Sequence, residues 1–168
     1  MVSKPPVKFT LLIVAMVWEL AACTSSPPRG LPAEMLRTPE GIAEWQREEE
    51  ALKKTVRATL EQYKREDSLK SLREYEAAVR DYLDHGFGLY RAYRDSPLTL
   101  PDNLIASLEQ RTGLLMDVAD EYIKHGSLAV GEGIASDVVH NYSDLPVLAP
   151  AQRRAEAVLL RYRYRQDY

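Results

Sequence analysis

Apolar side chains recur at helical spacing along most of this chain, and this pattern constrains the fold more than any other feature. After Thr38 they return every three, four or seven positions, which places them on one face of a helix; they are Ile42, Trp45, Leu52, Val56, Leu60 and Tyr63. No stretch alternates apolar and polar residues as a half-buried strand would, and no Asn-Gly turn joins β-branched stretches. The sequence therefore predicts an all-α fold.

Capping residues predict where the first two helices begin. Thr38 is a typical N-cap, and Pro39 suits the first helical position because its missing N–H group has no partner there in any case. Asp67 or Ser68 is expected to cap a second helix. Gly86 is able to stop that helix, and the residues after it are able to continue it beyond a kink.

The remaining helices are separated by proline and glycine. Residues 96–101, with proline near both ends, predict a connection, after which Asp102 begins a third helix that ends at Gly126. Two further helices are expected over residues 127–142 and 151–166. The sequence thus predicts a compact bundle of four to five helices.

Length and charge restrict the class of protein. The 168 residues suffice for one domain with appendages, and 45% hydrophobic with 28% charged residues is typical of a chain that buries a core. The net charge of −3 and the isoelectric point near 5.7 provide no overall attraction to phosphates. We expect no nucleic-acid partner.

The first residues have the order of a secretory signal. Lys4 and Lys8 precede an apolar run over residues 9–18, and small residues follow it. The run is about half the roughly 20 residues that a bilayer-spanning helix needs. The alternative interpretations are a buried helix or an uncleaved membrane anchor, and we favour the removable signal.

Leu20, Ala21, Ala22 and Cys23 resemble the lipobox of bacterial lipoprotein precursors. The resemblance implies cleavage after Ala22, a thioether-linked diacylglycerol on Cys23, and N-acylation of its new amino group. Several acyl chains anchor stably because each buried methylene contributes about 0.8 kcal/mol. Glu19 departs from the pattern, in which this position is apolar.

The residue after the cysteine bears on location. In the family's sorting pattern an aspartate there retains the protein in the inner membrane, and here Thr24 follows instead. The resemblance implies a lipid anchor in the outer membrane, facing the periplasm, in a Gram-negative host. Cys23 is the only cysteine, so no disulfide within the chain is expected.

These features predict three regions. Residues 1–22 are the signal peptide, residues 23–39 are the lipidated cysteine with a flexible tether rich in proline and serine, and residues 40–168 are the helical domain.

Each histidine follows an acidic residue by about one helical turn, which places each pair on one helix face; the pairs are Asp81 with His85, Glu121 with His125 and Asp137 with His140. His85 and His125 are therefore candidate metal ligands across a bundle. The alternative is that a histidine in a last helical turn interacts with the negative end of the helix. We favour this second interpretation and expect no metal and no cofactor besides the lipid.

Motifs for catalysis are missing from the sequence. It contains no Gly-x-Ser-x-Gly or Ser-x-x-Lys motif and no glycine-rich phosphate loop. An envelope hydrolase would need a carboxylate such as Glu121 or Glu132 in a cleft. We expect a protein that is not an enzyme.

The C-terminal segment is rich in arginine and tyrosine, namely Arg153, Arg154, Arg161, Tyr162, Arg163, Tyr164 and Arg165. It is a candidate interaction surface for an anionic partner, lipid headgroups or cell-wall polymer. The alternative, which we favour, is that arginines suit the C-terminal end of a helix while tyrosines cover the edge of the core.

Together the sequence predicts a membrane-anchored, periplasm-facing lipoprotein that acts as an assembly, scaffold or stabilising factor for an envelope protein. Secretion, conjugation and pilus-type machines use small helical lipoproteins of this build, which is an analogy of architecture only. The main alternative is a module that binds peptidoglycan or anionic glycolipid through the C-terminal segment.

Overall fold

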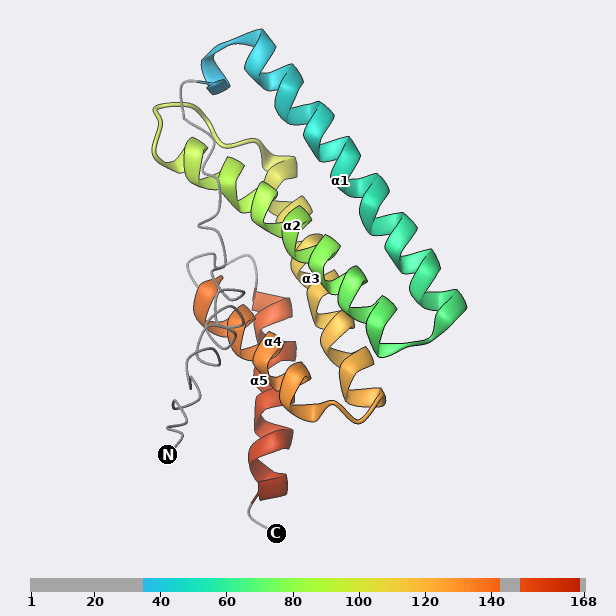
Figure 1. The fold of residues 1–168 in the computed structure, drawn as a ribbon. Helices are drawn as coiled ribbons and strands as arrows, with labels where there is room; N and C mark the ends of the chain where they lie inside the picture. The colour runs from blue at the N-terminus through green and yellow to red at the C-terminus, as the bar shows by residue number, and fades with distance from the viewer. Residues whose placement is uncertain (1–34, 143–148, 167–168) are drawn as a thin grey trace, which may run out of the picture.

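The computed structural model describes residues 35–142 and 149–166, and within them the chain is helical (Figure 1). A short 3-10 helix precedes five α-helices, which are η1 (Met35–Arg37), α1 (Pro39–Glu66), α2 (Leu69–Arg94), α3 (Asp102–Lys124), α4 (Leu128–Asn141) and α5 (Ala149–Gln166). The described ranges contain no strand. The predicted all-α bundle is confirmed.

The predicted caps begin the first two helices. Thr38 Oγ1 accepts a hydrogen bond from the Gly41 amide at 3.1 Å, and Pro39 is the first residue of α1. Asp67 and Ser68 divide the two roles that the sequence left open. Asp67, at a φ of 45°, ends α1 in the left-handed conformation, and Ser68 Oγ caps α2 by accepting from the Ser71 amide at 3.2 Å.

The helices pack largely in chain order. α1 contacts α2, α2 contacts α3, α3 contacts α4, and α5 contacts both α4 and α3. In Figure 1 α1 and α2 form a long antiparallel pair, and α4 and α5 lie on the other side of α3. The residues with no exposed surface are concentrated on α2 and α3, including Leu72, Leu83, Leu108, Leu115 and Met116. The core therefore follows these two helices.

The apolar face of α1 is covered less completely than the core helices. Ile42 remains 39% exposed, and Trp45, Leu52 and Leu60 are only partly buried against the core. Because α1 lies at the edge of the bundle, its first half has α2 and the start of α3 as neighbours. This incomplete cover leaves room for a pocket.

Two segments differ in detail from the predicted boundaries. α2 continues through Gly86 to Arg94, which is the second of the two possibilities that the sequence left open, and Gly86 lies against Leu108 and Arg111 of α3. Met35–Arg37, placed in the predicted tether, form η1, with Leu36 buried. Gly126 takes a φ of 78° directly after α3, as predicted.

The predicted signal segment, the lipobox with Cys23, and the tether before Met35 lie outside the described residues. Of the helices that the structure does describe, none combines the length and hydropathy that crossing a membrane requires.

Candidate functional site

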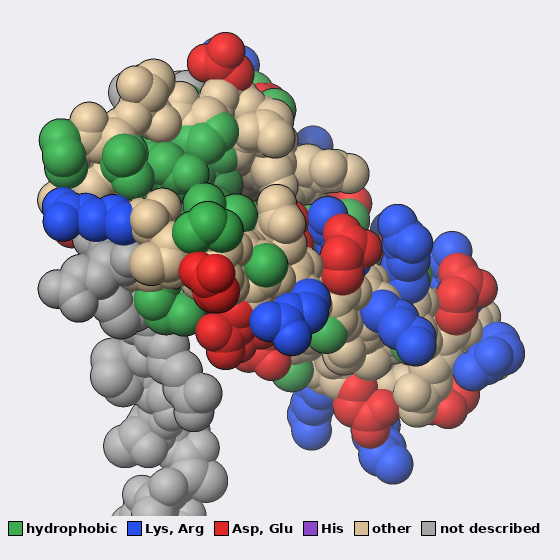
Figure 2. All heavy atoms as spheres, turned by 90° about the horizontal axis from the view of Figure 1, so that it is seen from above, with side chains coloured by type: hydrophobic (Ala, Val, Ile, Leu, Met, Phe, Trp, Pro, Cys, Tyr) green, Lys and Arg blue, Asp and Glu red, His purple; other side chains and the backbone are tan. Residues whose placement is uncertain are grey.

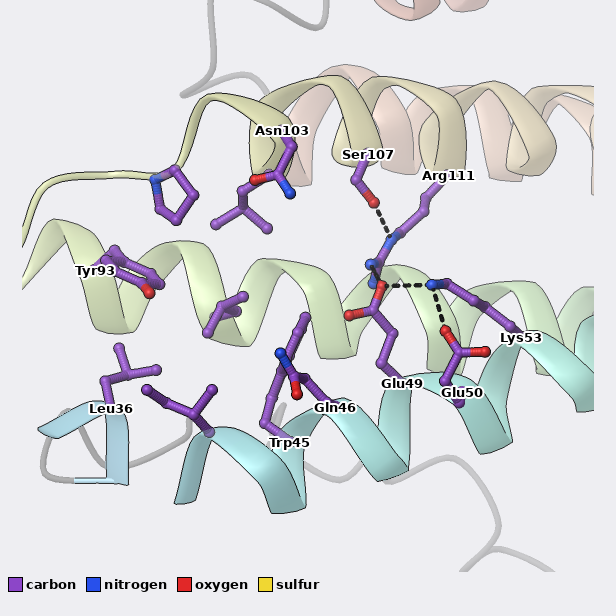
Figure 3. Close-up of a pocket in the computed structure, with 14 residues that line it drawn as sticks. Leu36, Trp45, Gln46, Glu49, Glu50, Lys53, Tyr93, Asn103, Ser107 and Arg111 are labelled. Atoms are coloured by element: carbon purple, nitrogen blue, oxygen red, sulfur yellow. Dashed lines mark hydrogen bonds and ion pairs between the residues drawn. The ribbon is translucent and has the colours of Figure 1, made fainter. Parts of the chain in front are cut away.

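A pocket of about 650 Å³ lies where α1 begins, α2 ends and α3 begins (Figure 3). This volume is within the range of roughly 300–1,000 Å³ that ligand-binding pockets have. Gln46, Glu50 and Asn103 line it and are exposed, so the pocket is open to solvent. We therefore treat it as the candidate functional site.

One half of the pocket is apolar. Leu36, Leu89 and Leu104 are buried in its wall, and Trp45 and Tyr93 are partly buried beside them. Figure 2 looks down on this end of the molecule and shows hydrophobic side chains gathered mostly on one side, with acidic and basic side chains mixed on the other. An apolar group of a ligand could therefore be buried at this end of the bundle.

The other half of the pocket carries alternating charges (Figure 3). Arg111 Nη2 donates to Glu49 Oε1 at 2.6 Å, and Lys53 Nζ lies 3.3 Å from Glu49 Oε1 and 2.8 Å from Glu50 Oε1. The hydrogen bond between Lys53 and Glu50 raises the pKa of Lys53 and lowers that of Glu50. Two cations and two carboxylates thus neutralise one another within the pocket wall.

Arg111 is the most deeply placed of these groups, with 1% of its surface exposed. Its Nε donates to Ser107 Oγ at 3.0 Å, its Nη1 donates to the Tyr82 carbonyl at 2.8 Å, and its guanidinium carbon lies 3.8 Å from the centre of the Tyr82 ring. Burial lowers the pKa of Arg111, whereas Tyr82 and Glu49 oppose that shift. An arginine remains protonated under such conditions.

Gly86 makes the position of Arg111 possible. A Cβ at residue 86 would lie 2.6 Å from Arg111 Nη1 and 2.9 Å from Leu108 Cδ2. In a helix the side chain of residue i+4 lies near the backbone carbonyl of residue i, so a side chain at position 86 would lie near the Tyr82 carbonyl. Because Gly86 has no side chain, the guanidinium of Arg111 can approach the Tyr82 carbonyl.

His85 lies beside this pocket, stacked on a wall residue. Its ring is 4.9 Å from the Trp45 ring with an interplanar angle of 8°, and Nδ1 is 3.9 Å from Glu48 Oε2. His85 Nε2 and Trp45 Nε1 are buried without a hydrogen-bond partner among the residues that the structure describes. Burial lowers the pKa of His85, which favours the neutral ring.

His125 belongs to a different cluster, at the end of α3. Its Nε2 is 3.0 Å from Tyr63 Oη and 3.3 Å from Asp67 Oδ1, and Tyr63 donates to Glu121 Oε2 at 2.8 Å. The predicted end-of-helix position is therefore correct for His125 but wrong for His85, because α2 does not stop at Gly86. The structure does not bring the two histidines together, and among the described residues no group of three or more potential ligands is placed to hold a metal.

The carboxylates proposed for hydrolysis are not in the pocket. Glu121 interacts with Lys124 and accepts from Tyr63, and these contacts, led by Lys124, lower its pKa. Glu132 is partly buried on α4 and does not line the pocket either. The carboxylates that do line it, Glu49 and Glu50, are each paired with a cation.

The two adjacent arginines of the C-terminal segment differ in their surroundings. Arg154 pairs with Asp117 at 2.7 Å and with Asp120 at 2.5 Å, which ties α5 to α3. Arg153 and Arg161 are exposed. The backbone of α5 continues to Gln166, and the side chains of the remaining candidates lie outside those that the structure describes, namely Tyr162, Arg163, Tyr164 and Arg165.

Comparison with protein-family models, curated proteins and solved structures finds no match to this chain. Its function is therefore inferred from its own residues.

Proposed function

We propose that this chain is a lipid-anchored protein of the cell envelope whose helical domain binds a partner protein and acts as an assembly or stabilising factor. The open pocket between α1, α2 and α3 carries the binding part of this proposal, because partly buried aromatic rings and exposed polar side chains both line it. The lipobox-like segment that ends at Cys23 carries the anchoring part.

The chemistry of the pocket supports binding rather than catalysis. A general acid or base must exchange a proton with its substrate, and a nucleophile must be accessible to it. In this pocket Arg111, Lys53, Glu49 and Glu50 are committed to one another. The pair of Arg111 and Glu49 joins α3 to α1, and the pairing leaves none of these four groups as an obvious acid, base or nucleophile.

The anchor is tested by metabolic labelling with palmitate followed by membrane fractionation. The full chain should incorporate label and sediment with the outer membrane, whereas Cys23→Ser should lose the label and either accumulate as precursor or leave the membrane. Ser25→Ala is the matched control, since it lies outside the lipobox. Label retained by Cys23→Ser would refute lipidation at this residue.

Partner binding is tested by site-specific photocrosslinking in cells. A crosslinker at Asn103, in the pocket wall, should capture one envelope protein in stoichiometric amount. A crosslinker at Lys70, on the exposed start of α2, should not capture that protein. Equal capture from both positions would contradict a partner-binding role for the pocket end.

A second candidate function is recognition of peptidoglycan or anionic glycolipid. It is favoured by the exposure of Arg153 and Arg161 on α5. Replacing Arg161, Arg163 and Arg165 together by alanine should then abolish sedimentation with cell wall or anionic vesicles. Unchanged sedimentation would exclude this candidate.

A further inference from the structure

Two amide side chains lie on opposite walls of the pocket. Gln46 projects from α1 and Asn103 from α3, and Figure 3 shows both pointing into the space between the helices. Both residues are exposed, and neither side chain forms a hydrogen bond with another residue that the structure describes. A carboxamide offers N–H donors and a C=O acceptor, which are the groups that pair with the C=O and N–H of a peptide bond.

The surroundings of these amides select for a neutral occupant. The nearby charges are paired, Arg111 with Glu49 and Lys53 with Glu50, so the pocket presents no unbalanced charge to a ligand. Burying an unpaired charge against such a wall would be costly. A peptide backbone is polar without being charged and meets this requirement.

The apolar half of the pocket adjoins these groups. Leu36, Leu89 and Leu104 form a buried wall, with the rings of Trp45 and Tyr93 beside it. Burying an apolar side chain of a ligand against such a wall is favourable, and the two amides can form hydrogen bonds with the backbone that carries this side chain. The arrangement thus offers separate places for the two parts of one residue.

We infer that this pocket binds an extended segment of the partner protein, with a bulky apolar side chain in the apolar half and its backbone between Gln46 and Asn103. This inference rests on the proposed partner-binding function and names the chemistry of the partner.

The test is a peptide titration followed by tryptophan fluorescence. The chain has two tryptophans, and Trp18 lies in the signal segment that cleavage after Ala22 would remove. The Trp18→Phe variant makes Trp45 in the pocket wall the only tryptophan even where precursor remains. The protein is reconstituted in lipid vesicles, and the probes are acetyl-Ala-Ala-X-Ala-Ala-amide peptides in which X is Leu, Phe or Asp. The Leu and Phe peptides should shift Trp45 emission saturably, and the Asp peptide should not.

Matched variants test the role of the two amides. Gln46→Ala and Asn103→Ala should each weaken binding of the Leu peptide by about tenfold, the loss of roughly one hydrogen bond. Gln110→Ala, an exposed amide of α3 outside the pocket, should leave binding unchanged. All three positions are exposed, and equal helicity by circular dichroism will show that the variants are folded.

Four results would overturn the inference. The first is the absence of any saturable shift with the Leu and Phe peptides, and the second is equal affinity in the Asn103→Ala and Gln110→Ala variants. The third is a shift with decanoate but not with the peptides, which would assign the pocket to a fatty chain. The fourth is a change in emission, without peptide, when residues 24–34 are replaced by a Gly-Ser repeat, which would assign it to the chain's own segment.

The outcome is separable from that of the proposed function. If the wild-type chain incorporates no palmitate, the anchor is refuted and the peptide titration is unaffected. A negative titration, in turn, would refute the peptide site while crosslinking from Asn103 still reports on a partner.

Discussion

Arg111 Nη2 lies 2.6 Å from Glu49 Oε1, which joins α3 directly to α1 at the base of the pocket. The arginine side chain is 1% exposed and the glutamate side chain 13% exposed. Opposite charges so far from water interact strongly, and removing one of them leaves the other uncompensated. Removing either partner should therefore destabilise this end of the bundle and leave an unpaired charge in the pocket wall.

Glu49→Ala should lower the free energy of unfolding by about 3 kcal/mol, because it leaves the buried guanidinium of Arg111 without its counter-ion. Urea denaturation followed by circular dichroism at 222 nm measures the change. Glu61→Ala, which removes an exposed partner of Lys64 on the same helix, is the control and should have little effect. Equal effects of the two substitutions would mean that the buried pair does not stabilise the fold.

Gly86→Ala should destabilise the protein by about 1–2 kcal/mol, although alanine is the better helix former. The added methyl group would meet Arg111 and Leu108, both of which are fully buried, so their side chains would have to shift within the core. Gly113→Ala on α3 is the matched control, since a Cβ there meets no atom within 4 Å, and it should stabilise by up to about 1 kcal/mol. Thermal unfolding of the two variants compares them, and a stabilising Gly86→Ala would disprove the close approach.

His85 should make stability depend on pH. Burial lowers its pKa in the folded state below the ordinary value of 6.5, with Glu48 and Glu49 opposing that shift and Arg111 adding to it. The unfolded chain then binds the proton more readily, so the stabilisation is complete above pH 6.5 and is lost as the pH falls through the folded-state pKa.

His85→Phe preserves a ring against Trp45 and removes this titration. Its free energy of unfolding should therefore decline less than that of the wild type between pH 7 and pH 5, measured by urea denaturation at each pH. His140→Gln, at an exposed position of α4, should follow the wild-type profile. Parallel profiles for His85→Phe and the wild type would show that His85 does not contribute.

The helices could be predicted from the sequence because caps and apolar periodicity are local signals. Thr38 and Ser68 cap the starts of helices with their side chains, and Gly126 takes a positive φ after α3. These roles depend on the residue type and its near neighbours in the sequence. The role of Gly86 could not be predicted in this way. Glycine is needed there because Arg111 of α3 approaches α2 closely, and the residues around Gly86 in the sequence do not record that approach.

The buried ion pair did leave a trace in the sequence, although the prediction missed it. Arg111 falls between Leu108 and Leu115, and Glu49 falls between Trp45 and Leu52, in each case three and four residues from its apolar neighbours. Charged residues on helices are usually solvated, so neither residue is recognised as buried from its own helix alone. Opposite charges at core positions of two helices indicate a buried pair.

The pocket itself required the structure, because it arises from what does not cover α1. Small polar residues of α3, Asn103 and Ser107, lie opposite Trp45 and Gln46 and leave space that larger side chains would fill. No periodic pattern records an unfilled volume between helices, since each helix retains an apolar face that suits a packed neighbour.

Arg154 and Arg153 are adjacent on α5, and comparing their variants distinguishes an arginine paired with α3 from one exposed to solvent. Arg154 binds Asp117 and Asp120 of α3, whereas its neighbour on α5 faces solvent. Arg154→Ala should loosen α5, so its backbone amides should exchange with deuterium several-fold faster, because a partly exposed ion pair contributes roughly 1 kcal/mol or less. Arg153→Ala should leave the exchange of α5 unchanged. If the two variants exchange alike, the contact with Asp117 and Asp120 does not hold α5 in place, and Arg154 belongs with the exposed arginines as a candidate for binding an anionic partner.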